Sequence, residues 1–362
     1  MKVITFDLHT HLNEKNILAF DYWKRVKEIG LDAVAITEHN FCDPKGAFDR
    51  LNKTKPEGIL LIPGIEINSS VGHALVYGKD ESLYNEVELL EDKADIERVL
   101  ELVKEKGFYF SFAHPFGYEH DSVCFLAGEE KTKKLIKKYG CGVEIYNGMV
   151  SQLSNFLYDS QWITKPFNFV SFMEKNIVSR KIGLGKVGGK IKKSFDSKRE
   201  DIVMRCIKAI ELGNTAGFIT AGSDSHSAER IGTGIMKLKL EEELTVETIF
   251  NGLKKKENII WSGPLIKETE KGVFEKVDFK LKRMEIAQGI QYITQKAVKK
   301  SANKIPTKKI KGKISGLKNS RVTKKIKSIK FGGRIKGTKI RERIGKTRIA
   351  QRIKKISERK KE

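Results

Sequence analysis

The sequence has little cysteine, little proline and no long apolar run, and each shortage excludes a class of protein. Its four cysteines, Cys42, Cys124, Cys141 and Cys206, are widely spaced and form no CxxC pair. A disulfide framework is therefore not expected, and the predicted location is the reducing cytoplasm. No apolar run approaches the roughly 18 residues that cross a bilayer, and the N-terminus has no signal-peptide pattern. Seven prolines and an apolar share of 39% argue against a disordered chain.

The net charge of the chain is concentrated at one end. The 70 basic and 46 acidic residues give a formal charge of +24. Residues 296–362 hold 27 Lys and Arg against 3 Asp and Glu, so this tail carries the whole excess. Such a tail is expected to bind a polyanion, either nucleic acid or an anionic membrane surface. Its regularly spaced isoleucines suggest an amphipathic helix and its glycines a flexible segment.

The body, residues 1–265, alternates short β-rich runs with helical stretches. Seven strands are predicted, at 3–8, 33–37, 59–67, 73–77, 109–113, 142–146 and 217–221. Helices are predicted at 21–29, 82–106, 135–139 and 202–212, each followed by a glycine that stops it. Apolar strands alternating with helices predict a mostly parallel sheet, and six or seven such units favour a closed or distorted α/β barrel.

The alternation breaks at about residues 148–200, where an irregular insertion beside the barrel is predicted. Its glycine- and lysine-rich run at 181–193 contains Gly183-x-Gly185-x-x-Gly188, the spacing of a dinucleotide-binding fingerprint. That fingerprint needs a strand before it and an acidic residue after it. A flexible basic loop is therefore the preferred interpretation. Residues 266–295 are predicted to be a linker or a peripheral element.

Six of the seven histidines stand at the ends of predicted strands, in company with two acidic residues. The segments are DLHTH (7–11), TEHN (37–40), PGIE (63–66), GH (72–73), AHP (113–115) and GSDSH (222–226). In α/β barrels the C-terminal rim gathers side chains from several strands, and residues spaced i, i+2 point the same way in a strand. Nitrogen and carboxylate ligands without thiolates suit Zn²⁺, Mn²⁺ or Fe²⁺. Only His120 has no strand before it.

These motifs resemble, in their order, the polymerase and histidinol phosphatase (PHP) superfamily of metal-dependent phosphoesterases. The resemblance rests on DLHTH, AITEHN, IPGIEIN, GHALVYG, FAHP, GVEIYNG and AGSDSH, and covers roughly residues 1–234. It implies a distorted (β/α)7 barrel over residues 1–265, with two or three divalent metal ions, Zn, Mn or Fe, at the rim.

The resemblance also implies which residues hold the ions. The first ion would take His9, His11, Glu66 and Asp224. Glu66 would bridge to a second ion, and a third would bind elsewhere on the rim. The remaining implied ligands are His73 and His114 for the second ion, and His39 and His226 for the third.

Two positions qualify this ligand set. Glu144 stands where some family members place another ligand, although a buried structural acid fits the residue equally well. Asn16 stands near the position at which members carry Asp or His, so the third ion is expected to be held loosely or to use Glu14 in its place.

The expected activity is hydrolysis of a phosphate ester by a metal-activated water, without a side-chain nucleophile. The substrate would be a small phosphomonoester or nucleotide. The alternative is a nuclease whose tail holds the nucleic acid. Asp7 is expected to orient a ligand histidine or to make a strand-end hydrogen bond. Arg230, four residues after His226, is expected to bind a phosphate oxygen or to lie on the surface.

Overall fold

The computed structural model describes residues 2–159, 168–169, 172, 175–176, 184–256, 259–263 and 274–276. The predicted tail, 296–362, lies outside the described residues, as does most of the predicted linker. Within the described part, no helix is both long enough and apolar enough to cross a membrane.

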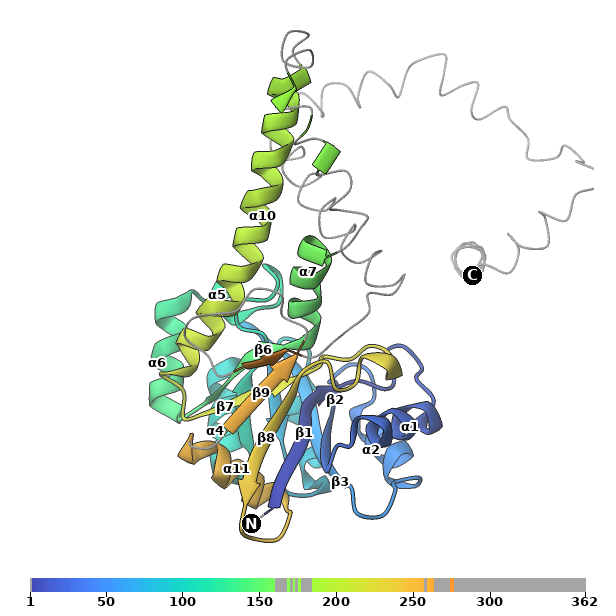
Figure 1. Cartoon of the computed structure of the whole chain (residues 1–362). Helices are drawn as coiled ribbons and strands as arrows, with labels where there is room; N and C mark the ends of the chain where they lie inside the picture. The colour runs from blue at the N-terminus through green and yellow to red at the C-terminus, as the bar shows by residue number, and fades with distance from the viewer. Residues whose placement is uncertain are drawn as a thin grey trace, which may run out of the picture. The chain divides into compact units, whose positions relative to one another are not determined.

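The described strands form one ten-stranded mixed sheet in the order β10-β9-β8-β1-β2-β3-β4-β5-β6-β7 (Figure 1). Their bounds are β1 (Lys2–Thr10), β2 (Ala33–His39), β3 (Leu60–Ser69), β4 (Gly72–Tyr77), β5 (Tyr109–Phe112), β6 (Gly142–Asn147), β7 (Phe218–Gly222), β8 (Ile235–Leu240), β9 (Ile259–Gly263) and β10 (Phe274–Lys276). Strands β1–β3 are parallel, as are β5–β7, whereas β4 is antiparallel to both of its neighbours. All seven predicted strands are confirmed, and β8–β10 are additional.

The sheet curls until the segment after β7 reaches β1. The Asp224 N–H donates to the His9 carbonyl (2.7 Å), and the His11 N–H donates to the Ser225 carbonyl (3.1 Å). The first half of β1, by contrast, pairs with β8. Strands β1–β7 therefore form a nearly closed α/β barrel, as predicted, with a seam at which β1 has two different partners.

Glycine makes the close approach at this seam possible. A Cβ on Gly222 would lie 2.3 Å from the His9 Cβ, and one on Gly234 would lie 2.1 Å from the Gly222 carbonyl oxygen. A larger residue at either position would push the strands apart.

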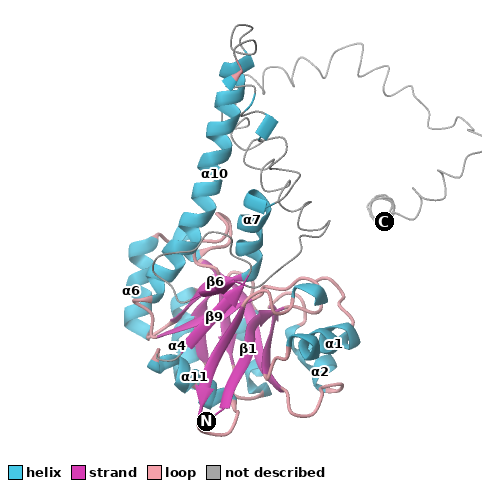
Figure 2. Ribbon diagram, in the orientation of Figure 1, coloured by secondary structure: helices cyan, strands magenta, loops and turns pink. Residues whose placement is uncertain are grey.

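Most helices lie beside the strands, whereas α7 and much of α10 extend beyond the end of the sheet (Figure 2). Their bounds are α1 (Ala19–Ile29), α2 (Pro44–Asn52), α3 (Val87–Leu90), α4 (Ile96–Lys106), α5 (Val123–Leu126), α6 (Glu129–Tyr139), α7 (Gly148–Asp159), α10 (Leu184–Gly213) and α11 (Val246–Lys255), with 3₁₀ turns η1 (Glu81–Asn85) and η2 (Ala228–Arg230). Helices α1, α4 and α6 end at Gly30, Gly107 and Gly140, each in the left-handed conformation that the stop signal predicts.

The single helix predicted over 82–106 is wrong, because the segment forms η1, α3 and α4. The chain between α3 and α4 bonds instead to the end of β3: the Lys93 N–H donates to Asn68 and the Ser70 N–H to Ala94. Helix α4 then restarts at Asp95, whose side chain accepts from the N–H groups of Glu97 and Arg98.

The prediction of an irregular insertion at 148–200 is also wrong where the structure describes it. Residues 148–159 form α7, and the glycine- and lysine-rich run from 184 onward is part of α10, not a loop; Gly183 lies outside the described residues. Ile202 and Val203 of α10 pack with Leu153 and Phe156 of α7 in a small second core. The glycine-rich run therefore forms the first turns of a helix whose later part is held by this packing.

Candidate metal centre

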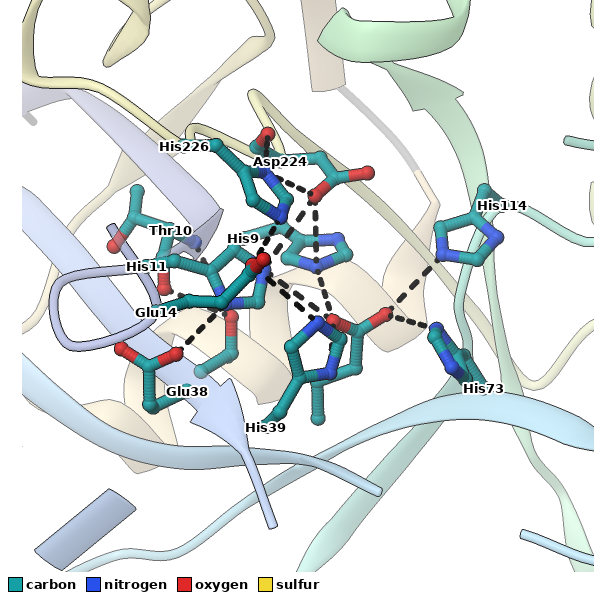
Figure 3. A network of polar contacts seen from close by, with 12 residues as sticks. His9, Thr10, His11, Glu14, Glu38, His39, His73, His114, Asp224 and His226 are labelled. Carbon is teal, nitrogen blue, oxygen red and sulfur yellow. Dashed lines mark hydrogen bonds and ion pairs between the residues drawn. The ribbon is translucent and has the colours of Figure 1, made fainter. Parts of the chain in front are cut away.

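The rim of the barrel gathers six histidines into one cluster (Figure 3). His9 lies in β1, and His11 follows it directly. β2 ends at His39, and the segments after β5 and β7 carry His114 and His226. β4 runs antiparallel, so its second residue, the sixth histidine His73, lies at the same rim as the ends of the parallel strands. The structure thus brings together every histidine that the sequence places at a strand end, whereas His120 is exposed beside Asp121.

Glu66 of β3 lies at the centre of the cluster and is almost fully buried. Five imidazole nitrogens surround its carboxylate. Three of them lie near Oε2 and two near Oε1: His9 Nε2 (3.4 Å), His11 Nε2 (3.3 Å) and His39 Nδ1 (3.1 Å), then His73 Nδ1 (3.0 Å) and His114 Nε2 (3.2 Å). Each oxygen therefore serves a different group of rings, which is the arrangement that a bridging carboxylate needs.

Asp224 approaches the same rings from the far side of the seam. Its Oδ1 lies 3.7 Å from His9 Nε2, 3.4 Å from His11 Nε2 and 3.4 Å from His226 Nδ1. The other oxygen, Oδ2, accepts from the Asn147 amide (3.2 Å). Asp224 and Glu66 thus face each other across His9 and His11.

Two further carboxylates contact the outer nitrogens of His9 and His11. Glu144 Oε1 lies 2.9 Å from His9 Nδ1, and Glu38 Oε1 lies 3.4 Å from His11 Nδ1. Because an outer Nδ1–H that donates to a carboxylate leaves the Nε2 lone pair pointing inward, these acids set the tautomer that a metal ligand requires.

Glu14 closes the outer side of the cluster. Its Oε2 lies 2.6 Å from His226 Nε2 and 3.8 Å from His39 Nε2. Asn16, two residues later, has a left-handed φ of 54°. The loop therefore directs a charged side chain, Glu14, at the two histidines of the outer position.

Two residues of the cluster have strained backbones. Asp224 and His114 have φ values of 51° and 26°, in a region that residues other than glycine seldom occupy. Strain of this kind persists only where the surrounding structure holds it, and it is concentrated at functional sites.

The charges in the cluster are mutually stabilising. Burial alone would raise the pKa of Glu66, but the imidazoles, His39 and His73 foremost, hold it well below its usual range. Burial would also raise the pKa of Asp224, which His9 and His11 hold well below its usual value. Burial lowers the pKa of His39 to about 4, which favours the neutral form of the ring that a metal ion binds.

The donor set fits divalent cations. Three groups bring their nitrogen or oxygen atoms within 4.8 Å of one another: His9–His11–Glu66, His39–Glu66–His73 and His11–His39–His226. Among the described atoms of the cluster, His9 Nε2, His11 Nε2 and His39 Nδ1 are buried without a hydrogen bond of good geometry. Unsatisfied buried atoms are costly, and a cation among them would remove that cost.

A comparison with known families gives one match, to the PHP domain over residues 7–144. Residues 7–144 are thus recognised as a PHP domain. Members of the PHP family are metal-dependent phosphoesterases. A search of curated proteins finds no match.

Three solved structures are similar to this chain at low identity. PsfC from Pseudomonas syringae is 15% identical, with 70% of this chain and 90% of PsfC covered and a TM-score of 0.45. The lesion-specific endonuclease PfuEndoQ from Pyrococcus furiosus is 16% identical (72% and 59% covered, TM-score 0.45). A proposed metal-dependent phosphoesterase from Bifidobacterium adolescentis is 15% identical (68% and 95% covered, TM-score 0.34).

Glu144 of the PHP domain has both carboxylate oxygens engaged. Besides His9 Nδ1, it accepts from the His114 N–H (2.7 Å) and from the Asn147 amide (3.0 Å). These contacts favour an orienting role over the ligand role that the family resemblance allowed.

Asp7 contacts backbone groups in place of a ligand ring. It accepts from the N–H groups of Ser223 (2.9 Å), Gly232 (3.0 Å) and His9 (3.2 Å), so the strand-end alternative is the one observed. Burial raises its pKa to about 6. Asp7 thereby joins β1 to the segments that follow β7.

Arg230 is 1% exposed, which rules out the alternative of a surface arginine. Its role toward a phosphate stays a prediction.

Sequence analysis missed the orienting contact of Glu38, although TEHN places this acid beside His39. The Glu38 carboxylate contacts residues that follow a different strand: the His11 ring and the Leu12 N–H, which donates to it (2.8 Å).

Proposed function

We propose that the cluster binds two or three divalent ions and hydrolyses a phosphate ester, with a small phosphomonoester or a nucleotide as substrate. The observation that carries the proposal is the position of Glu66 between five imidazole nitrogens, with one oxygen toward each group. A carboxylate so placed can hold two cations together, as two-metal phosphoesterase sites require.

The proposed ligands follow the geometry. His9, His11, Glu66 and Asp224 would hold the first ion, and His73, His114 and the other oxygen of Glu66 the second. His39 and His226 would hold the third. Glu14 would supply the negative charge there that Asn16 does not. Burial alone would raise the pKa of Glu14, but its contacts with His226 and Lys15 lower that pKa to about 2.

The chain's own residues prepare the site for chemistry. Bound divalent ions lower the pKa of water and neutralise charge on the phosphoryl group. Glu38 and Glu144 hold the inner nitrogens of His11 and His9 toward the centre, and Asn147 fixes Asp224. Arg230 is proposed to help hold an anionic substrate.

A test of this proposal replaces Glu66 by Gln and Asp224 by Asn. Phosphate release from a panel of phosphomonoesters with Mn²⁺ or Zn²⁺ should fall by about a thousandfold, because the negative charge that holds the cations is lost. Glu130→Gln, on the exposed side of α6, is the matched control and should leave turnover unchanged. If either site variant kept more than about a tenth of wild-type turnover, the assignment would be wrong.

The alternative, a nuclease, is favoured by one observation, the +24 charge of residues 296–362. We propose that this tail binds a polyanion in the cytoplasm and takes no part in the chemistry. Assays on 5′-labelled oligonucleotides beside the small phosphomonoesters separate the two activities.

A further inference from the structure

One exposed aromatic ring lies directly against the cluster. Phe41, two residues after the end of β2, stacks on His39 with ring centroids 4.9 Å apart and planes 9° from parallel. Phe41 is 59% exposed, whereas His39 is 8% exposed. Because the imidazole covers one face of the phenyl ring, the exposed part is the side directed away from His39.

The loop that carries Phe41 is fixed on both sides. The Cys42 N–H donates to the His39 carbonyl (2.8 Å), and the Asn13 amide donates to the carbonyls of Cys42 (3.0 Å) and Asp43 (2.8 Å). Asp43 in turn caps α2 through the Gly46 N–H (3.0 Å). The ring is therefore presented on a held backbone, which lowers the entropy that a ligand would have to remove on binding.

Other aromatic residues near the rim differ from Phe41. Tyr118 meets His114 edge-on at 6.3 Å and is partly buried against the second core. Phe20 of α1 is 75% exposed, and no described ring contact joins it to a histidine of the cluster. Phe41 thus combines an open face with direct contact to a proposed metal ligand.

We infer that Phe41 forms a stacking subsite for a nucleobase on the substrate. The inference rests on the proposed function, since it is the phosphate at the cluster that places the rest of the substrate beside His39. A flat apolar ring offers no hydrogen bond to a sugar hydroxyl or a carboxylate, but it stacks on any base. The base can belong to a mononucleotide or to the end of a nucleic-acid strand.

The experiment compares adenosine 5′-monophosphate with ribose 5-phosphate, which share the phosphate and the sugar and differ only by the base. The metal-loaded wild type should prefer the nucleotide. Phe41→Ala should lower kcat/KM for the nucleotide by about tenfold or more and leave ribose 5-phosphate within about twofold. Phe41→Trp should keep the preference, and Phe20→Ala, the matched control, should change neither value. A 5′-phosphorylated oligonucleotide assayed in parallel shows which of the two base sources is used.

Two results would overturn the subsite. One is an equal loss on both substrates in Phe41→Ala, which would make the ring a shield for His39. The other is a wild type that uses ribose 5-phosphate as well as the nucleotide. If no substrate is hydrolysed, the proposed function fails separately. The subsite is then decided by calorimetric binding of the nucleotide: weaker binding to Phe41→Ala than to wild type supports it, and equal binding refutes it.

Discussion

Arg205 of α10 connects the helical insertion to the turn that carries His114. It is 6% exposed, and its Nη1 donates to the Gly117 carbonyl (2.7 Å) while Nη2 pairs with Asp201 (3.0 Å). The Gly117 N–H in turn donates to the His114 carbonyl (2.7 Å). Arg205 is therefore two hydrogen bonds away from a proposed ligand with a strained backbone.

Replacing Arg205 by Met keeps an unbranched stem and removes the donors. A hydrogen bond from a charged group is worth about 1.5–3 kcal/mol, and the Gly117 carbonyl would be left buried without this partner. We expect the free energy of unfolding to fall by about 2–3 kcal/mol. Metal affinity at the His114 position should fall by about 10–100-fold, the usual effect of losing a residue that orients a ligand.

The assay pairs urea unfolding with zinc competition titration, and both are repeated on Arg199→Met. Arg199 lies on the same helix and also donates to a backbone carbonyl, that of Leu157 (2.8 Å) in α7, away from the His114 turn. The control should lose stability and keep its metal affinity. If both variants lose stability alike and neither changes metal affinity, Arg205 only packs the helix and the reasoning is refuted.

Three further predictions concern the cluster and the tail. Burial alone would lower the pKa of His9, His11 and His114. Nearby carboxylates outweigh burial: they raise the pKa of His9 and of His11 well above the usual value, and the pKa of His114 to about 9. These rings hold protons at pH 7 without metal, so metal binding should release protons, and metal affinity should increase as pH rises from 6 to 9. Calorimetry in buffers of different ionisation enthalpy measures the proton release. A heat of binding that does not depend on the buffer would contradict the prediction. Glu14→Gln should remove the most weakly held ion, seen as a lower metal content after chelator dialysis, with two ions retained; an unchanged content would exclude Glu14 as a ligand. Removing residues 296–362 should leave turnover on a small phosphate ester within about twofold and abolish salt-sensitive binding to nucleic acid or anionic vesicles; a truncated protein that still binds them would refute the division of roles.

The sequence predicted the barrel strands and the histidine cluster because both depend on local signals. Each parallel strand is a short buried apolar run. Every histidine of the cluster follows such a run except His73, which stands near the start of antiparallel β4. β8 was missed although Met236, Leu238 and Leu240 alternate with Lys237 and Lys239, a clear half-buried strand pattern. α2 was missed although Asp43 and Pro44 form a strong helix start.

The errors arose where distant contacts decide the structure. The break before α4 depends on hydrogen bonds to the end of β3, which the apolar spacing of 82–106 does not encode. The glycine-rich run continues as a helix into the part of α10 that packs on α7, and its own glycines do not indicate a helix. The orienting contacts of Glu38 and Glu144 cross between strands, so no sequence spacing reveals them.

The seam of the barrel has a consequence for how the protein acquires its activity. The proposed first ion draws on His9 and His11 at one end of the domain and on Asp224, more than 200 residues later. Asp7 and the close approach at Gly222 join the same two segments. A nascent chain that has only completed β6 holds five of the six cluster histidines but cannot assemble this position. Hydrolysis would therefore begin only when the last barrel strand is in place. On metal loss, amide hydrogen exchange would increase at residues 9–11 and 223–225 before it increases elsewhere in the barrel.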